Sequence, residues 1–287
     1  YLLALSLTTF VAISQTSLNM NLRHNWNDTT LPLRSGLRYN EIWGYSDPDD
    51  GSEYAIMGSV NKVHFFNITN PDSPVEVAAF VGGNYSLWRD MKTYGKHAYS
   101  VADEGTEGLM AFDLDNLPGS VSKVLQTTAF FSKCHNIFID TLAGRLYAAG
   151  CNTRSNGLIV LDLTANPASP TLLASTALAG GYVHDVYVRN NMAYCSHGFN
   201  GLYVYDMTNP ASPVFQGSLS GYSQAGYNHS SWLNTAGDRL VFCDETHGSS
   251  IKIADVSDLI NIRLLSLFKS AMLAPSYTNS IAHNPFI

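Results

Sequence analysis

The chain has 287 residues, of which 45% are hydrophobic and 14% are charged, and its formal net charge is −7. This length is sufficient for one large domain with a substantial core. The acidic balance, with no cluster of lysine or arginine, argues against a surface for nucleic acid or anionic membranes.

The N-terminal stretch YLLALSLTTFVAISQ is apolar and ends in small residues. This pattern is typical of the hydrophobic region and cleavage site of a secretory signal whose basic start is missing; a buried N-terminal strand is the alternative. We therefore expect residues 1–14 to be a signal remnant, and the protein to be exported to the extracellular space or bacterial cell surface. An apolar run of about 13 residues is too short for a transmembrane helix, so none is expected.

From residue 42 onward, one pattern of four short strands recurs along the chain. In the fourth copy the strands are expected at residues 184–188, 192–196 and 202–205, followed by VFQGSL. A turn residue ends the third strand of each copy, at Asn67, Asp113, Asp162, Asp206 and Asp255; the differences between these numbers are 46, 49, 44 and 49. A short carboxylate at such a turn accepts backbone N–H groups, so we interpret these residues as structural.

Four antiparallel strands repeated at this period predict an all-β fold, a β-propeller of four-stranded blades. We expect residues 15–287 to form one propeller domain with five complete blades and the start of another near residue 282. Residues 19–32 would supply an outer strand that closes the ring. The chain resembles a fragment truncated at both ends, whose full-length form closes with one or two more blades.

Several motifs in the repeats resemble those of a known family. LIVLDLT (158–164) and LYVYDMT (202–208) are similar to the LVIVD repeat, and EIWGYSD, GGYVHDVYV and NHSSWLN resemble the exported choice-of-anchor B proteins of bacteria. The resemblance implies a surface-displayed propeller with an anchoring or sorting signal beyond the present C-terminus. It implies no particular chemistry.

The repeat spacing also predicts a site. The first strand of each blade lies nearest the axis, so one residue per blade should gather at one mouth of the channel: Gly44, Arg89, His135, His184, His229 and His283. The loops between the second and third strands should reach the same face, with Asp103, Glu104, Asn152, His197, Asp244, Glu245 and His247. Hairpin counting places His184 opposite His197 and His229 opposite Asp244.

Three interpretations of this cluster remain open. The histidines would tie blades together through buried hydrogen bonds, or they would form a binding site for a protein, glycan or other polar ligand, with Arg89 suited to an anionic group. A divalent transition metal bound by His135, His184, His229 and His283 is the third, and it would make the protein a metalloprotein or metalloenzyme. We favour a non-catalytic binding or display role, because the sequence contains no Gly-x-Ser-x-Gly elbow. The predicted ligand-binding residues are Arg89, Asp90, His135, His184, Asp185, His197, His229, Asp244 and His283.

The four cysteines form no CxxC pair, which argues against a structural zinc site. Counting across the turn at residues 141–144 places Cys134 opposite Cys151, and this predicts a disulfide in an exported protein. Cys195 and Cys243 fall in different blades and are expected to be free, buried thiols.

Overall fold

The computed structural model describes residues 20–270 and 280–287. The predicted signal remnant, residues 1–14, lies outside the described residues. The helical structure of the described part is a three-residue 3-10 turn, η1 (Leu259–Asn261), and no helix there is long and apolar enough to cross a membrane.

Within residues 20–270 and 280–287, twenty strands form five separate four-stranded antiparallel sheets, each built from consecutive strands. The first two sheets contain β1 (Tyr39–Ser46), β2 (Glu53–Ser59), β3 (Lys62–Asn67), β4 (Val75–Val81), β5 (Arg89–Tyr94), β6 (His97–Ala102), β7 (Leu109–Asp113) and β8 (Ser122–Thr127). The other three contain β9 (Asn136–Asp140), β10 (Arg145–Cys151), β11 (Arg154–Asp162), β12 (Thr171–Ala177), β13 (Asp185–Arg189), β14 (Met192–Ser196), β15 (Leu202–Asp206), β16 (Val214–Leu219), β17 (Asn228–Leu233), β18 (Arg239–Asp244), β19 (Ile251–Asp255) and β20 (Arg263–Phe268). The strands predicted in the fourth repeat are confirmed to within one residue.

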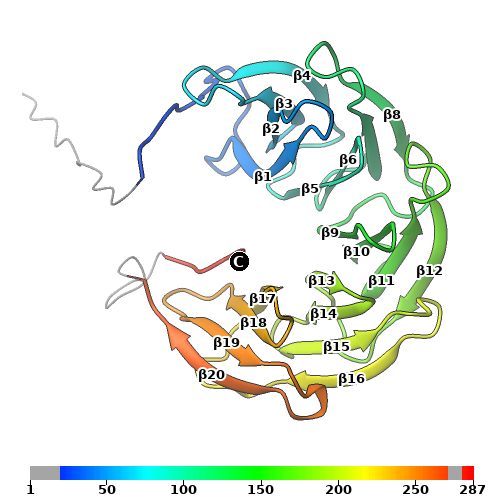
Figure 1. Cartoon of the computed structure of the whole chain (residues 1–287), viewed down its shortest axis with the longest axis vertical. Coiled ribbons are helices and arrows are strands. Elements are labelled where there is room, and N and C mark those ends of the chain that lie inside the picture. The colour runs from blue at the N-terminus through cyan, green and yellow to red at the C-terminus, as the bar shows by residue number, and fades with distance from the viewer. Residues whose placement is uncertain (1–19, 271–279) are drawn as a thin grey trace, which may run out of the picture.

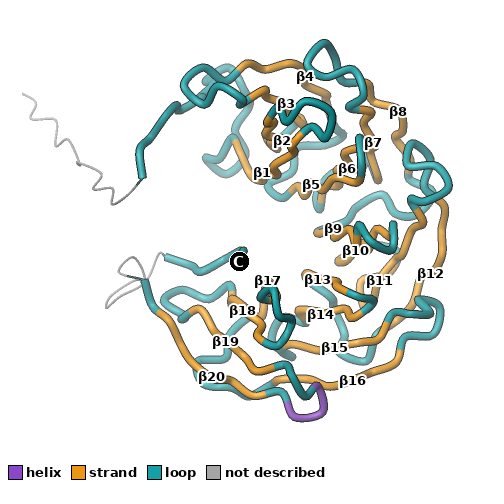
Figure 2. The backbone as a smooth tube through the Cα atoms, in the orientation of Figure 1, coloured by secondary structure: helices purple, strands orange, loops and turns teal. Residues whose placement is uncertain are grey.

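The five sheets stand around a common axis, with β1, β5, β9, β13 and β17 innermost and β4, β8, β12, β16 and β20 outermost (Figure 1). The described part of the chain is almost entirely strand and loop (Figure 2). Four of the five hydrophobic clusters lie between neighbouring sheets. One of them, for example, joins Val101 and Leu109 of the second sheet to Ile137 and Leu146 of the third. The core is therefore a set of interfaces between sheets, as expected for a propeller.

The ring is open between the first and fifth sheets: a hydrophobic cluster joins every other pair of neighbouring sheets, and none among the described residues joins these two (Figure 1). The expected sixth-blade strand is not formed: residues 280–287 have no regular secondary structure and run in towards the axis (Figure 1). Phe286 packs there between Trp43 of the first sheet and Trp232 of the fifth, with ring-centroid distances of 6.3 Å and 5.0 Å.

The outer strand expected at residues 19–32 is not formed in the described part, where residues 20–32 contain no strand. Each of the five sheets takes its outer strand from its own repeat. The residues before β1 pack instead on the first sheet, where the Trp26 ring lies 4.7 Å from that of Phe66. Hydrogen bonding within one repeat completes each sheet locally, so no distant strand is needed.

The predicted disulfide is also absent. Cys134 and Cys151 are neighbours as the register predicts, but both are free thiols, with their sulfurs 3.1 Å apart. The Cys134 thiol also lies within hydrogen-bond distance of the carbonyl oxygens of Asn136 and Ala149. Burial raises the pKa of Cys134 well above its usual range, which holds it in the thiol form. Cys195 and Cys243 are free and buried, as predicted.

The structural interpretation of the turn aspartates is confirmed. The carboxylates of Asp113, Asp162, Asp206 and Asp255 each accept the backbone N–H two residues later, at 2.8–3.1 Å. These bonds end the third strand of each sheet and start the turn to the fourth.

The substitution Asp206→Ala should therefore destabilise the fold by about 1 kcal/mol, the usual contribution of one such hydrogen bond. The measurement is the free energy of unfolding in urea. Asp49→Ala is the matched control, because this exposed carboxylate makes only an ion pair with Lys96 and its removal should change stability by less than about 0.5 kcal/mol. Equal effects of the two substitutions would contradict the structural role.

Candidate functional site

Four histidines lie side by side at one end of the central channel. His135 and His184 directly precede β9 and β13, His229 is in β17, and His283 belongs to segment 280–287. The ring centroids of successive pairs are 4.2 Å, 4.5 Å and 3.8 Å apart. We call these four residues the imidazole arc. Three members stand at the start of the innermost strands of the third, fourth and fifth sheets, and segment 280–287 brings His283 beside them.

Glu245, in the loop after β18, lies opposite the arc. One of its carboxylate oxygens is 3.9 Å from Nε2 of both His184 and His229, and the other is 3.9 Å from Nε2 of His283. The sequence places Glu245 at this face but does not distinguish it from its neighbours. It is the main functional candidate that the predicted set lacks.

The prediction that His229 lies opposite Asp244 is wrong. A β-bulge between Asn228 and Ser230 shifts the register, so Asp244 pairs with Asn228. The buried Asp244 carboxylate accepts the Tyr222 hydroxyl at 2.8 Å and forms an ion pair with Lys252 at 3.0 Å. Since a bulge re-aims the side chains that follow it, Asp244 ties the loops of the fifth sheet together while Glu245 faces the histidines.

The central imidazoles of the arc are held in the neutral form. Burial lowers the pKa of His184 to about 3 and that of His229 even further, and neighbouring imidazoles add to both effects. Burial also lowers the pKa of His283. Neutral rings at pH 7 each keep one nitrogen lone pair available. The Nδ1 atoms of His184 and His229 are buried and have no hydrogen-bond partner among the described residues.

His135, at one end of the arc, is in a different electrostatic environment. Burial alone would lower its pKa, but its Nδ1 lies 3.1 Å from Oδ2 of Asp103, and this carboxylate raises the pKa overall. Asp103 therefore fixes the orientation of the His135 ring.

The cavity behind the arc has a volume of about 270 Å³ and is rich in carboxylates. Besides Glu245 and Asp103, its lining includes Glu41, Asp90 and Asp185. Burial raises the pKa of both Glu41 and Asp185 to about 7, and the charge of Asp90 adds to the effect. Asp90 and Asp185 thus line the channel as predicted. In the first sheet the lining residue is Glu41, at an irregularity between Tyr39 and Ile42, and not the predicted Gly44.

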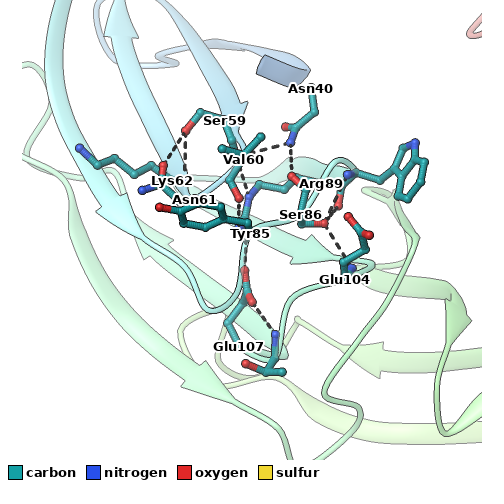
Figure 3. A network of polar contacts seen from close by, with 12 residues as sticks. Asn40, Ser59, Val60, Asn61, Lys62, Tyr85, Ser86, Arg89, Glu104 and Glu107 are labelled. Atoms are coloured by element: carbon teal, nitrogen blue, oxygen red, sulfur yellow. Dashed lines mark hydrogen bonds and ion pairs between the residues drawn. The ribbon is translucent and has the colours of Figure 1, made fainter. Parts of the chain in front are cut away.

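Arg89 does not offer its charge to the cavity, which corrects the prediction of an anion site. Its guanidinium donates to the Glu107 carboxylate at 2.5 Å and to the carbonyl oxygen of Ser59 at 2.9 Å (Figure 3). Neither the Arg89 nor the Glu107 side chain is exposed. The first strand of the second sheet starts close to the end of β2, so the Arg89 side chain reaches the Ser59 carbonyl oxygen. Arg89, paired with Glu107 of its own repeat, thereby links the first two sheets.

The His197 ring is also turned away from the mouth of the channel. Its backbone lies opposite His184 as predicted, because Asp185 pairs with Ser196 and the His184 N–H donates to the Ser196 carbonyl oxygen. The His197 ring packs between Gly180 and Tyr203, and its Nδ1 lies 3.0 Å from the carbonyl oxygen of Tyr182. Burial lowers its pKa to about 4. It is a core histidine between the third and fourth sheets.

One further arrangement was not predicted. The Nε2 atom of His64 lies 2.9 Å from the Ser59 hydroxyl, and Nδ1 lies 2.7 Å from the Glu76 carboxylate. Such an order of serine, histidine and carboxylate occurs in hydrolases. Ser59 is fully buried and His64 is 2% exposed, so no substrate reaches the hydroxyl, and the three groups stabilise the first sheet.

Two stretches of the chain match the model of the LVIVD repeat, residues 153–177 and 180–220, which cover β11 to β16. The chain is a β-propeller in which these two stretches match the LVIVD repeat. Among solved structures, a functionally unknown protein from Desulfotomaculum acetoxidans is similar over 85% of this chain and 74% of its own, with a TM-score of 0.59 and 12% identity. The periplasmic gluconolactonase of Pseudomonas aeruginosa is similar over 79% of this chain and 72% of its own, with a TM-score of 0.58 and 10% identity. At these identities the likeness is one of fold. No curated protein matches the sequence significantly.

The burial of Arg89 leads to a testable expectation. Arg89→Met leaves the Glu107 carboxylate buried without its charged partner and should destabilise the protein by about 3–5 kcal/mol. The double variant Arg89→Met/Glu107→Leu should recover most of this loss. Both are measured by denaturant unfolding. A stable single variant would show that the guanidinium is not needed between the sheets.

The buried His197 should contribute to sensitivity to acid. Its pKa is about 4 in the folded protein against about 6.5 in an unfolded chain, so the unfolded state binds one more proton between these values. Its contribution is complete above pH 6.5 and is lost as the pH falls towards 4. Over this range His197→Gln should reduce the slope of unfolding free energy against pH by up to about 1.4 kcal/mol per pH unit. An unchanged slope would contradict the assignment.

Proposed function

We propose that this protein is an exported, non-catalytic binding propeller, and that its ligand is a cation taken up in the cavity behind the imidazole arc. The observation that carries this proposal is the charge of the lining. Five carboxylates, Glu41, Asp90, Asp103, Asp185 and Glu245, line one cavity of about 270 Å³. Arg89, which lines the same cavity, is neutralised by Glu107.

Carboxylates that share a low-dielectric cavity repel one another, and a positively charged ligand relieves this repulsion. The raised pKa values of Glu41 and Asp185 agree with this, because burial and, to a smaller extent, repulsion by the charge of Asp90 disfavour their ionised forms. Asp90 is partly compensated by Lys92, whose Nζ lies 2.5 Å from Oδ1. Asp103 is bonded to His135, and the remaining three, Glu41, Asp185 and Glu245, form no ion pair with lysine or arginine among the described residues.

Aromatic side chains at the cavity are compatible with the same ligand class. Trp88 and Tyr182 line the cavity and remain 45% and 39% exposed, and the Tyr227 ring packs edge-on against His184 at a centroid distance of 5.1 Å. Aromatic faces attract cations. Exposed aromatic groups beside a polar cavity are also typical of binding sites.

Binding, and not hydrolysis, is supported by the state of the serine side chains. The hydroxyl beside His64 is closed to solvent, and the Ser230 hydroxyl donates to the His283 carbonyl oxygen at 2.6 Å. Export is supported by the apolar start of the sequence, and display at a bacterial surface by the resemblance to choice-of-anchor B proteins.

The test uses chelator-treated protein and three separate probes: Zn²⁺, Ca²⁺ and spermidine. At least one should raise the melting temperature. At 100 times the dissociation constant a ligand adds about 2.7 kcal/mol, which corresponds to about 5–10 °C for a domain of this size.

The double variant Asp185→Asn/Glu245→Gln should lose this increase. Asp49→Asn/Asp72→Asn, which removes the same charge from exposed positions, should keep it. The proposal fails if none of the three cations stabilises the protein, or if the two double variants respond alike.

A further inference from the structure

We propose that the cation is a divalent transition-metal ion, bound by His184, His229 and Glu245 with His283 as a fourth ligand. This inference rests on the proposed function and names the ligand class of the same cavity. It differs from the four-histidine set expected from the sequence, because Glu245 replaces His135.

The distances fit an ion between the side chains. One ligand atom from each of His184, His229 and Glu245 lies within 4.8 Å of the others, and each of the two Nε2 atoms is 3.9 Å from one Glu245 oxygen. A separation of 3.9 Å is too long for a hydrogen bond. Two ligands that each lie about 2.0–2.2 Å from one ion are at most about 4.4 Å apart. Both separations of 3.9 Å fall within this limit, so each of the two histidines can share an ion with Glu245.

The ring nitrogens of His184 and His229 form no hydrogen bonds with the described residues. His184 and His229 are 6% and 5% exposed, and the Nδ1 atom of each has no hydrogen-bond partner among the described residues. The blade-tying interpretation requires buried hydrogen bonds, and these two rings do not form them. The Nε2 atoms of both rings face Glu245 at 3.9 Å, beyond hydrogen-bond distance, so each neutral ring keeps its Nε2 lone pair for an ion.

The donor set indicates which cations fit. Imidazole nitrogens with one carboxylate suit zinc, copper, nickel and iron, whereas calcium and magnesium prefer oxygen ligands throughout. Neither nearby basic side chain opposes the ion. Arg89 is paired with Glu107, and Lys92 is paired with Asp90.

His283 completes the set from segment 280–287. Its Nε2 is 3.9 Å from the second Glu245 oxygen, and its ring lies 3.8 Å from that of His229. The Ser230 hydroxyl donates to its carbonyl oxygen at 2.6 Å, which fixes the segment beside β17. His135 is held by Asp103 through Nδ1 and stands next to the set, as a neighbour of His184.

The experiment measures metal binding directly on the full chain after chelator treatment. Titration with Zn²⁺, followed by calorimetry and elemental analysis, should give one ion per chain. His184→Ala/His229→Ala should weaken binding at least about 100-fold, since it removes two of the four ligands. Cu²⁺ bound to the wild-type chain should show nitrogen superhyperfine splitting in its electron paramagnetic resonance spectrum.

His197→Gln is the matched control, because it removes a buried imidazole from the same blade without touching the cavity; it should bind Zn²⁺ within a few-fold of wild type. The inference is overturned if wild type binds no Zn²⁺, if His184→Ala/His229→Ala binds it as tightly as wild type, or if the copper spectrum lacks nitrogen coupling. Stabilisation by Ca²⁺ or spermidine without Zn²⁺ binding would overturn the metal assignment and leave the cation-binding proposal standing. Failure of all three probes would overturn both.

Discussion

The structure depends on one packing constraint: each four-stranded sheet has two apolar faces, and it can bury them only against the sheets of the neighbouring repeats. The clusters that join Val101 to Ile137, and Val160 to Val186, are instances of this contact. Stacking face to face brings the first strand of every repeat to a common axis. The imidazole arc is a consequence, because three successive sheets each place a histidine at the start of their first strand, and segment 280–287 adds His283 beside them.

The same constraint accounts for the polar character of the axis. Apolar side chains pack between the sheets, while the inner strands present Asp90, Asn136 and Asp185 to the channel. These groups cannot all satisfy one another. Asp90 accepts from Asn136 and from the backbone of Ile137, yet Glu41 and Asp185 are left crowded by its charge. A cavity with this unbalanced charge is stabilised by a cation, which connects the architecture to the proposed function.

Two buried ion pairs show that the position of a charged residue within a repeat decides whether it forms an ion pair inside the fold or faces the cavity. Arg89 begins β5 as the histidines begin their strands, but its long side chain reaches the carbonyl oxygen of Ser59 and pairs with Glu107. Asp244 and Glu245 are adjacent, yet one pairs with Lys252 inside the fifth sheet and the other faces three imidazoles. Charges that can reach a neighbouring loop are used for structure, and the remaining ones line the cavity.

The sequence by itself determined the repeat, the strands, the Asx turns and the gathering of the histidines, because these follow from local periodicity and from a repeat of fixed length. It also determined the adjacency of Cys134 and Cys151, through hairpin register. Only the tertiary structure decided which side chains face the cavity. The bulge at Asn228 directs Glu245, and not Asp244, towards the histidines, and the irregularity in β1 places Glu41 in the channel. Packing turns the side chains of Arg89 and His197 away from the cavity. Bulges and rotamers depend on contacts between sheets, and such contacts have no counterpart in the spacing of residues along one chain.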